Sequence, residues 1–240
     1  MARGSDVSSI LSKVPYFAGL PPPLVRTLAD MARLRDYRQG EVILWEGDPC
    51  EGLYVVLSGR VKVFKRSGEG REQVLRVLGP GRTFNDVPVF DGGLNPGSVA
   101  PLDAARVAIL PKARVLALVQ QHPAVAMAVI GVLADRLRGL TVLVEDLMLR
   151  NVTARVAKIL MDWAGGQTTL VEGAEAGCVR LTQTQLAAMT GSVREVVQRA
   201  LKTLERDGAI RLSRARICVL DLPSLRRWSD SGAGADAAQP

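Results

Sequence analysis

Short alternating runs of hydrophobic and polar residues fill the first half of the chain. The stretches "GEVILWEGD", "GLYVVLSGRVKVFKR" and "EQVLRVLGPG", between Arg35 and Leu110, are rich in β-branched and apolar residues and are separated by glycine-containing turns. Several short strands at this spacing are typical of an antiparallel sandwich or barrel. The pattern predicts a β-roll of the jelly-roll type, whose interior is either a plain core or a small-molecule cavity.

A helical period follows, from Pro123 to about Arg150. Apolar residues recur there at alternating steps of three and four, which is a heptad seam. The seam favours a two-stranded coiled coil, although a helix packed on its own domain would show the same pattern. On the first interpretation, the dimer interface is formed by Ile130, Leu133, Leu137, Leu140, Val144 and Leu147.

The region from residue 152 onward opens with an amphipathic helix and then predicts two short helices joined by a turn. The stretch "LTQTQLAAM" begins with Thr182 and has Gln185 three residues later, which is the pattern of a capping box. Gly191 predicts the turn, and Ser192 predicts the cap of the next helix, with Glu195 at its third position. A helix, a glycine-bearing turn and a second helix form a helix-turn-helix.

Beyond the second helix, "AIRLSRARICVLD" alternates and predicts a wing hairpin. The tail "SDSGAGADAAQP" is small and polar, so we expect it to be disordered. The predicted class is therefore α+β. Its parts are an effector-sensing β-roll in residues 1–122, a dimerisation helix in 123–151, a winged helix-turn-helix in 152–228 and a tail in 229–240.

The distribution of charge agrees with a nucleic-acid partner. The chain has a net charge of +7. Ten basic and four acidic residues lie between Arg180 and Arg227, so this block carries +6. Such a concentration is typical of a nucleic-acid-binding module. No apolar run reaches the roughly 20 residues of a membrane helix, and the start of the chain lacks a signal pattern. We expect a cytoplasmic protein without a membrane partner.

Other chemistry has little support in the sequence. Cys50, Cys178 and Cys218 are scattered and odd in number, which argues against a disulfide framework and a CxxC zinc site. Three cysteines alone cannot supply a four-thiolate iron–sulfur cluster. The single histidine, His122, is expected to start the long helix rather than bind haem. We find no metal cluster, cofactor fingerprint or histidine–nucleophile pair, which argues against an enzyme.

These segments together resemble the CRP/FNR family, that of the cyclic-AMP receptor protein and the fumarate–nitrate reduction regulator. The resemblance runs from "FAGLPPPLVRTLAD" to the wing. It is carried mainly by "GEVILWEGDPCEGLYVVLSGRVKVF" and "LTQTQLAAMTGSVREVVQRALKTLERDGAI". It implies a cytoplasmic, homodimeric transcriptional regulator that binds double-stranded DNA and contacts RNA polymerase, with 163–177 as the polymerase loop.

In the cyclic-AMP branch of this family, the recognition helix carries Arg-Glu, three further residues and Arg. The matching residues here are Arg194, Glu195 and Arg199. The resemblance implies a palindromic operator with a TGTGA-like half-site, in which the arginines bind guanines and the glutamate accepts from a cytosine. As an alternative, Glu195 is only the capping-box residue of its own helix. Phosphate contacts are expected from Arg180, Thr182, Gln183 and Ser192.

The effector pocket departs from the family pattern. Asn85-Asp86 stands where cyclic-AMP-binding members have Gly-Glu, and no arginine lies between Arg82 and Arg106 to hold a cyclic phosphate. An unpaired buried phosphate is costly, so the sequence argues against cyclic AMP as the effector. The residues expected at this pocket are Asn85, Asp86, Ser98, Arg136, Leu140 and Thr141, with Leu140 replacing a hydroxyl of the family pattern.

Alternatives to an effector-controlled regulator stay open at this point. The sensor could be degenerate, which would make the protein a constitutive DNA binder. A cyclic-nucleotide-responsive regulator is a further alternative. A different class of function is a ligand-binding module whose C-terminal block binds a protein rather than DNA. The salt dependence of binding would distinguish this alternative, because DNA binding weakens steeply with salt.

Overall fold

The computed structural model describes residues 2–164, 178–179, 181–213 and 216–231. The chain divides into two compact units. One contains Met1–Lys65 and Arg76–Gly139, and the other contains Arg66–Leu75 and Leu140–Pro240. The first unit holds most of the β-roll, and the second holds the helix-turn-helix.

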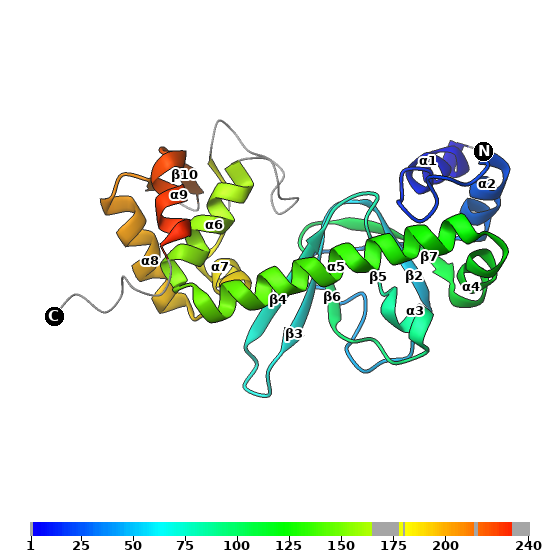
Figure 1. Cartoon of the computed structure of the whole chain (residues 1–240), viewed down its shortest axis with the longest axis horizontal. Coiled ribbons are helices and arrows are strands. Elements are labelled where there is room, and N and C mark those ends of the chain that lie inside the picture. The colour runs from blue at the N-terminus through cyan, green and yellow to red at the C-terminus, as the bar shows by residue number, and fades with distance from the viewer. Residues whose placement is uncertain (1, 165–177, 180, 214–215, 232–240) are drawn as a thin grey trace. The chain divides into compact units, whose positions relative to one another are not determined.

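The N-terminal elements combine a β-roll with short helices (Figure 1). In chain order they are α1 (Ala2–Leu11), α2 (Pro22–Met31), β1 (Arg33–Tyr37), β2 (Gly52–Ser58), β3 (Val61–Arg66), β4 (Glu72–Leu78), β5 (Thr83–Phe84), α3 (Val87–Asp91), β6 (Ser98–Pro101), β7 (Ala105–Pro111) and α4 (Lys112–Gln121). The long helix α5 (Pro123–Leu149) follows, as the heptad pattern predicts.

The strands form two antiparallel sheets, with the orders β1-β7-β2-β5 and β4-β3-β6. In the register of the first sheet, Tyr54 lies opposite Ile109, and in the second Lys62 lies opposite Ala100. Side chains of both sheets, among them Val61, Phe84 and Val99, share one buried cluster. The predicted β-roll is confirmed, and its interior contains a packed core.

Strand β2 shows why one part of the roll is apolar without alternation. Tyr54 and Val56 belong to the cluster inside the roll, whereas Leu53, Val55 and Leu57 belong to a second cluster. That second cluster is completed by α1, α2, α4 and the start of α5, which cover the outer face of the strand. Both faces of β2 are therefore buried, and both require apolar side chains.

The sequence pattern did not predict α1, α2 and α4, which gather beside the start of α5 (Figure 1). No single helix in the described residues is long and apolar enough to cross a bilayer. Helices α4 and α5 together are long and apolar enough for a membrane span, by length and composition only, but they are bent by 115°. Val115 and Leu118 of α4 and Val125 and Val129 of α5 are buried in the protein core.

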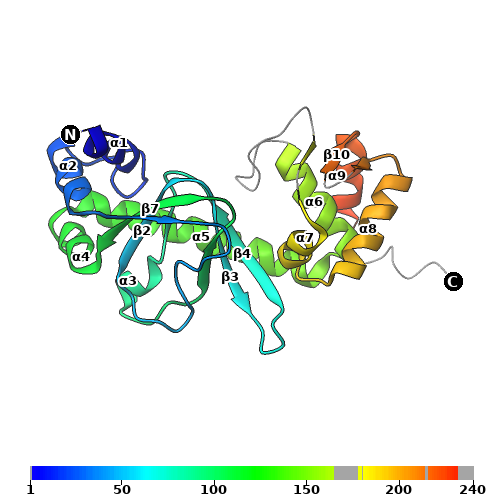
Figure 2. The same cartoon turned by 180° about the vertical axis from the view of Figure 1, so that it is seen from behind.

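The C-terminal unit is a winged helix-turn-helix. Its elements are α6 (Val152–Ala164), β8 (Cys178–Val179), α7 (Gln183–Thr190), α8 (Arg194–Arg206), β9 (Ile210–Ser213), β10 (Arg216–Val219) and α9 (Leu222–Asp230), and the sheet order is β8-β10-β9. Helices α6, α8 and α9 lie together (Figure 2). Leu160, Leu186, Leu201 and Leu204 form their common core with Ile217 of the wing.

The predicted cap of the second helix was wrong. Helix α8 begins at Arg194, Val193 is its N-cap, and no side chain caps it. The backbone N–H of Ser192 instead donates to the carbonyl of Ala187 at 3.0 Å, which closes the end of α7 around Gly191, whose φ is 63°. The turn therefore uses Ser192, so Glu195 is not part of a capping box.

The C-terminal boundary also differs from the prediction. Helix α9 was not expected, and its last residues, Ser229 and Asp230, fall within the stretch predicted to be a disordered tail. Proline in the first turn of α9 is a common start signal, and Leu225 and Trp228 anchor the helix to the core. Residues 232–240 lie outside the described part of the chain.

The cysteines give a third correction. Cys178 of β8 and Cys218 of β10 form a disulfide across directly paired positions. The scattered, odd set of cysteines argued against a disulfide framework, because a spacing of 40 residues contains no sign that two strands will bring these side chains together. Cys50 is a free, half-buried thiol.

Candidate nucleic-acid interface and effector pocket

Helix α8 has one buried and one exposed face, as its sequence period predicts. Val197, Ala200, Leu201 and Leu204 are buried in the core of the winged helix-turn-helix. Every third or fourth residue of a helix shares a face, so the charged residues of the first two turns are directed away from that core. Arg194, Glu195, Gln198 and Arg199 are all exposed. They form a polar face, which we call the α8 polar face.

Helix α7 positions the start of this face. Its capping box is confirmed, because Thr182 Oγ1 accepts from the Gln185 N–H at 3.1 Å and Gln185 Oε1 accepts from the Thr182 N–H at 2.9 Å. Gln183, in the first turn of α7, accepts a hydrogen bond from Nε of Arg194 at 3.2 Å. Gln183 is therefore within reach of the base-reading candidate, a contact that the sequence analysis missed.

The start of α7, the α8 polar face and the wing border a common hollow of about 400 Å³. Among the residues that line it are Thr182, Gln183, Arg194, Ser213 and Arg216. Two of these side chains are arginines, and the helix start adds backbone N–H groups, which carry a partial positive charge. The hollow can therefore accept an anionic group.

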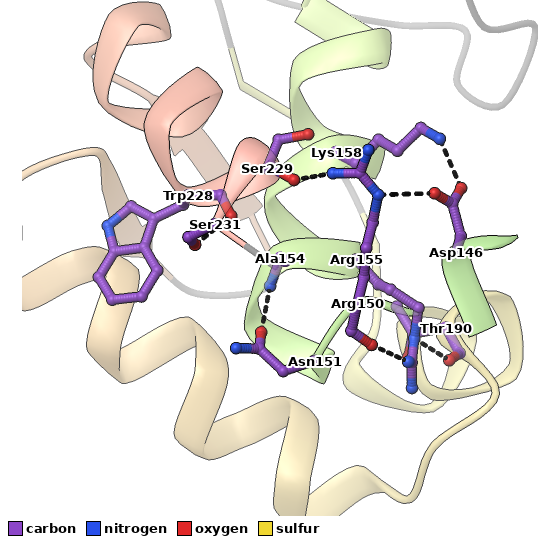
Figure 3. A network of polar contacts seen from close by, with 10 residues as sticks. All are labelled: Asp146, Arg150, Asn151, Ala154, Arg155, Lys158, Thr190, Trp228, Ser229 and Ser231. Atoms are coloured by element: carbon purple, nitrogen blue, oxygen red, sulfur yellow. Dashed lines mark hydrogen bonds and ion pairs between the residues drawn. The ribbon is translucent and has the colours of Figure 1, made fainter. Parts of the chain in front are cut away.

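A polar network fixes the helix-turn-helix to the end of α5 (Figure 3). Asp146 of α5 forms ion pairs with Arg150 and with Lys158 of α6. Arg150 also donates to the carbonyl of Ser229 in α9. Arg155 donates to the carbonyl of Arg150 at 2.5 Å and to that of Thr190, the last residue of α7, at 2.8 Å. The network holds four helices of this unit in one arrangement.

The predicted dimer seam is only partly exposed. Ile130, Leu137, Leu140 and Val144 are among the exposed large hydrophobic residues. Leu133 is half-buried against the core of the first unit, and Leu147 is half-buried as well. The exposed apolar surface of α5 also includes residues that the heptad does not contain, namely Met127, Val142, Met148 and Leu149.

In the β-roll, two of the predicted pocket residues form a buried ion pair. Arg136 of α5 pairs with Asp86, whose side chain is 3% exposed. Asp86 Oδ2 also accepts from the hydroxyls of Tyr16 at 2.6 Å and Thr83 at 3.2 Å. Arg136 donates further to the carbonyl and the hydroxyl of Thr83, at 2.9 and 2.8 Å. We call these four residues the Asp86 cluster.

The electrostatics of the cluster are dominated by burial. The pKa of Arg136 is lowered to about 10, mainly by burial; Tyr16 raises it, and Arg76 and Arg82 contribute smaller decreases. Burial also raises the pKa of Tyr16. Arg136 Nε is buried and has no hydrogen-bond partner within the part of the chain that the structure describes.

Two of the other predicted pocket residues, Asn85 and Ser98, form hydrogen bonds with residues outside the Asp86 cluster. Asn85 donates to the carbonyl of Gly52 at 3.3 Å and has a positive φ of 63°. Ser98 Oγ accepts from the N–H of Glu46 at 3.1 Å. On α5, Leu140 and Thr141 are exposed and follow Arg136 by one turn.

Two predictions lie outside the described residues. Arg180, expected to contact phosphate, is one of them. The second is the loop expected to meet RNA polymerase, because only Trp163 and Ala164 of 163–177 are described, both at the end of α6. Trp163 is buried in the core.

Known proteins resemble the chain in both halves. Residues 34–122 match the cyclic nucleotide-binding domain, and residues 154–228 match the Crp-like helix-turn-helix domain. The CRP-like cAMP-activated global transcriptional regulator of Mycobacterium tuberculosis is 30% identical over 221 residues, which cover 92% of this chain and 99% of the relative. The cyclic AMP receptor protein of Thermus thermophilus is 31% identical over 198 residues, which cover 82% and 88% of the two chains.

A solved structure shares the fold. It is a regulator from Eubacterium rectale described as of the Crp/Fnr family, and it superimposes with a TM-score of 0.76. The match covers 92% of this chain and 100% of that one, at 22% sequence identity.

Proposed function

Because the chain belongs to the CRP/FNR family of DNA-binding transcriptional regulators, we propose that it binds a palindromic, TGTGA-like operator as a homodimer. The observation that carries this proposal is the α8 polar face, where Arg194, Glu195 and Arg199 are exposed on the first two turns of the second helix. In a helix-turn-helix, that end of the second helix enters the major groove.

The chemistry of each side chain fits a base edge. Arginine donates a bidentate pair to O6 and N7 of guanine, and a carboxylate accepts from N4 of cytosine. Glu195 is available for this role because no side chain caps α8, which removes the alternative explanation for a glutamate at this position. Thr182, Gln183, Ser192 and Arg180 are proposed to contact phosphates, which orient the helix without reading sequence.

The exposed apolar surface of α5 supports the homodimer. Ile130, Leu137, Leu140 and Val144 keep a heptad spacing and are exposed in a single chain. Burying such a stripe against a second copy is the usual way in which a coiled coil removes it from water. A twofold dimer would present two recognition helices to successive major grooves, about 34–36 Å apart.

We further propose that the effector is not cyclic AMP, although one relative above is called a cAMP-activated regulator and the other a cyclic AMP receptor protein. To bind cyclic AMP as the resemblance implies, a carboxylate in this position would have to accept a hydrogen bond from the ribose hydroxyl of the nucleotide. Asp86 instead is 2% exposed and already paired with Arg136, Tyr16 and Thr83. Opening this cluster for a ligand would leave buried charges unpaired, which is costly. A constitutive DNA binder agrees best with this arrangement.

A second candidate is a regulator controlled by a different anion. Arg76 and Arg82 both lower the pKa of Arg136, so the surroundings of the Arg136–Asp86 pair carry further positive charge. The buried Nε of Arg136, which has no hydrogen-bond partner in the described residues, is a donor that an anionic ligand could satisfy. RNA polymerase stays an expected partner from the family resemblance.

The proposal is tested by fluorescence anisotropy on a labelled TGTGA-N6-TCACA duplex at about 150 mM salt, where specific regulators bind with a Kd of roughly 10⁻⁸ to 10⁻¹¹ M. A scrambled duplex, cyclic AMP and Arg199→Ala are the comparisons. We expect sequence-dependent binding without nucleotide and loss of the preference in Arg199→Ala.

Binding that requires cyclic AMP would show that the Asp86 cluster does open for this ligand. Equal affinity for both duplexes in every condition would contradict the TGTGA-like operator. A weak dependence of binding on salt would contradict DNA as the partner, because neutralised phosphates release counterions.

A further inference from the structure

The Cys178–Cys218 disulfide lies on the face of the wing sheet that is turned away from the core. Val179, Ile210 and Ile217 belong to the buried cluster of this unit, whereas neither cysteine does. Successive residues of a strand point to opposite faces, which accounts for this division. The disulfide therefore joins two strands outside the apolar cluster of this unit, although the side chain of Cys218 is itself buried.

Arginines share the face that carries the two sulfurs. Cys218 lies opposite Cys178 on one side and opposite Arg211 on the other. Arg216 precedes Cys218 by two residues on β10, and directly paired residues point to the same face. A nearby guanidinium favours the thiolate form of cysteine, which is the form that reacts in thiol–disulfide exchange.

The two cysteines differ in accessibility. Cys178 is half-buried, whereas the side chain of Cys218 is 6% exposed. A small disulfide can therefore reach Cys178 first, with Cys218 placed directly across the strand pair to complete the exchange.

The disulfide also connects the two segments that border the hollow described above. Thr182, which caps α7, follows Cys178 by four residues, and Arg216 lies two residues before Cys218. Among the residues that the structure describes, β8 consists of Cys178 and Val179, and both are paired with β10. A covalent link at one of these positions holds the start of α7 and the wing arginine at a fixed separation.

We propose that Cys178 and Cys218 form a reversible redox site. A small disulfide of the glutathione class oxidises the two thiols, and the oxidised protein binds the operator more tightly. The inference rests on the proposed function, because operator binding is the property that it changes. Proteins that bind chromosomal DNA work where thiols are kept reduced, and disulfides found there are usually redox-sensing.

The chemistry balances with the small disulfide as the oxidant. The Cys178 thiolate attacks one of its sulfurs, a mixed disulfide forms and one small thiolate leaves. The Cys218 thiolate then attacks Cys178 Sγ, which forms the protein disulfide and expels the second thiolate. The protein loses two protons and two electrons, and the oxidant becomes two thiols.

The test equilibrates the full-length protein over a series of reduced-to-oxidised glutathione ratios. Thiols are counted by alkylation and mass, and operator affinity is measured on the same samples. We expect three reactive thiols after reduction and one, Cys50, after oxidation. Reduction should weaken binding about tenfold and lower the slope of log affinity against log salt by about 1 for each phosphate that the protein no longer neutralises.

Variants separate the site from general effects of thiols. Cys178→Ser and Cys218→Ser should each bind like the reduced protein at every ratio, whereas Cys50→Ser should respond like the wild type. The comparison of oxidised with reduced wild type keeps the test valid if either serine variant fails to fold. Equal affinity of the two wild-type states, or three reactive thiols at every ratio, would overturn the proposal.

Failure of the proposed function has a different signature. In that case neither redox state would prefer the operator over scrambled DNA, even though the thiol count still changed with the glutathione ratio. This result would overturn both the operator and its redox control, whereas operator binding that is equal in both states overturns the redox control alone.

Discussion

The α8 polar face and the Asp86 cluster use charged side chains in opposite ways. Arg194 and Arg199 are exposed, whereas Arg136 is buried and bonded to Asp86 and Thr83. An exposed guanidinium keeps most of its donors for a partner, as Arg194 does beside its one bond to Gln183, but a buried one has most of its donors bonded inside the fold. Asp86 and the α8 polar face both lie in segments that match domains of the family, and burial decides which charged side chains can still bind a ligand.

The largest expected effect comes from breaking the Asp86 cluster. Arg136→Met leaves the buried Asp86 carboxylate without its counter-ion, so the free energy of unfolding should fall by about 3–5 kcal/mol. Urea denaturation measures it. Arg138→Met is the matched control on the same helix, because the Arg138–Asp135 pair is 80% and 81% exposed and should contribute about 0–1 kcal/mol.

A similar loss of unfolding free energy in Arg136→Met and Arg138→Met would contradict the buried ion pair between Arg136 and Asp86. It would mean that Asp86 is solvated in solution, and the argument against cyclic AMP would lose its main support. The proposals that the effector is not cyclic AMP and that the protein binds DNA constitutively can therefore be tested without a ligand.

The next effect concerns DNA. Arg194→Ala should remove about 1–3 kcal/mol of discrimination for each guanine contact, with little change in affinity for scrambled DNA. Lys202→Ala is the control, since Lys202 is an exposed cation in the second half of α8. It should weaken binding to both duplexes alike, because a charge that only meets phosphate reads no sequence. Titration of both duplexes by anisotropy distinguishes the two variants.

If Arg194→Ala also weakened both duplexes equally, Arg194 would be a phosphate contact. Its hydrogen bond with Gln183 would then place it with the start of α7 rather than with the α8 polar face.

A smaller effect is expected at the start of α7. Thr182→Ala removes the side-chain half of the capping box, which should lower the free energy of unfolding by about 1 kcal/mol. Thr184→Ala changes an exposed residue of the same helix and should have little effect in the same thermal melts. Equal behaviour of the two variants would show that this capping box adds little to stability.

The winged helix-turn-helix could be predicted from sequence because its signals are local. The period of Val197, Ala200, Leu201 and Leu204 defines the buried face of α8 within a few turns of chain. The capping box and the alternation of the wing are equally short-range. Ser192 was the exception, because two helix ends compete for it, and the closing bond of α7 takes its backbone N–H.

The Asp86 cluster could not be predicted as a whole, because its partners are distant in sequence. Tyr16 and Asp86 are 70 residues apart, and Thr83 and Arg136 are 53 apart. The sequence indicated Asp86 and Arg136 only through the family resemblance, and it gave no sign that they satisfy each other. The Cys178–Cys218 disulfide was missed for the same reason, since strand pairing brings the two residues together.

The smallest expected effect concerns Asp162 of α6. This residue is half-buried, so its exposure lies between that of the α8 polar face and that of the Asp86 cluster. Burial raises its pKa, Lys158 lowers it, and Asp146 raises it. A raised pKa means that folding disfavours the ionised form, so this group reduces stability as the pH rises from its unfolded pKa through its folded pKa. Asp162→Asn should therefore be slightly more stable than the wild type at pH 7 and equal to it below about pH 3.5, where the unfolded-state carboxyl is also protonated. Thermal melts across this range, with the exposed Asp230→Asn as control, measure the difference. A variant that is less stable at pH 7 would show that attraction to Lys158 outweighs burial, and Asp162 would then resemble Asp86, whose charge is stabilised by a partner inside the fold.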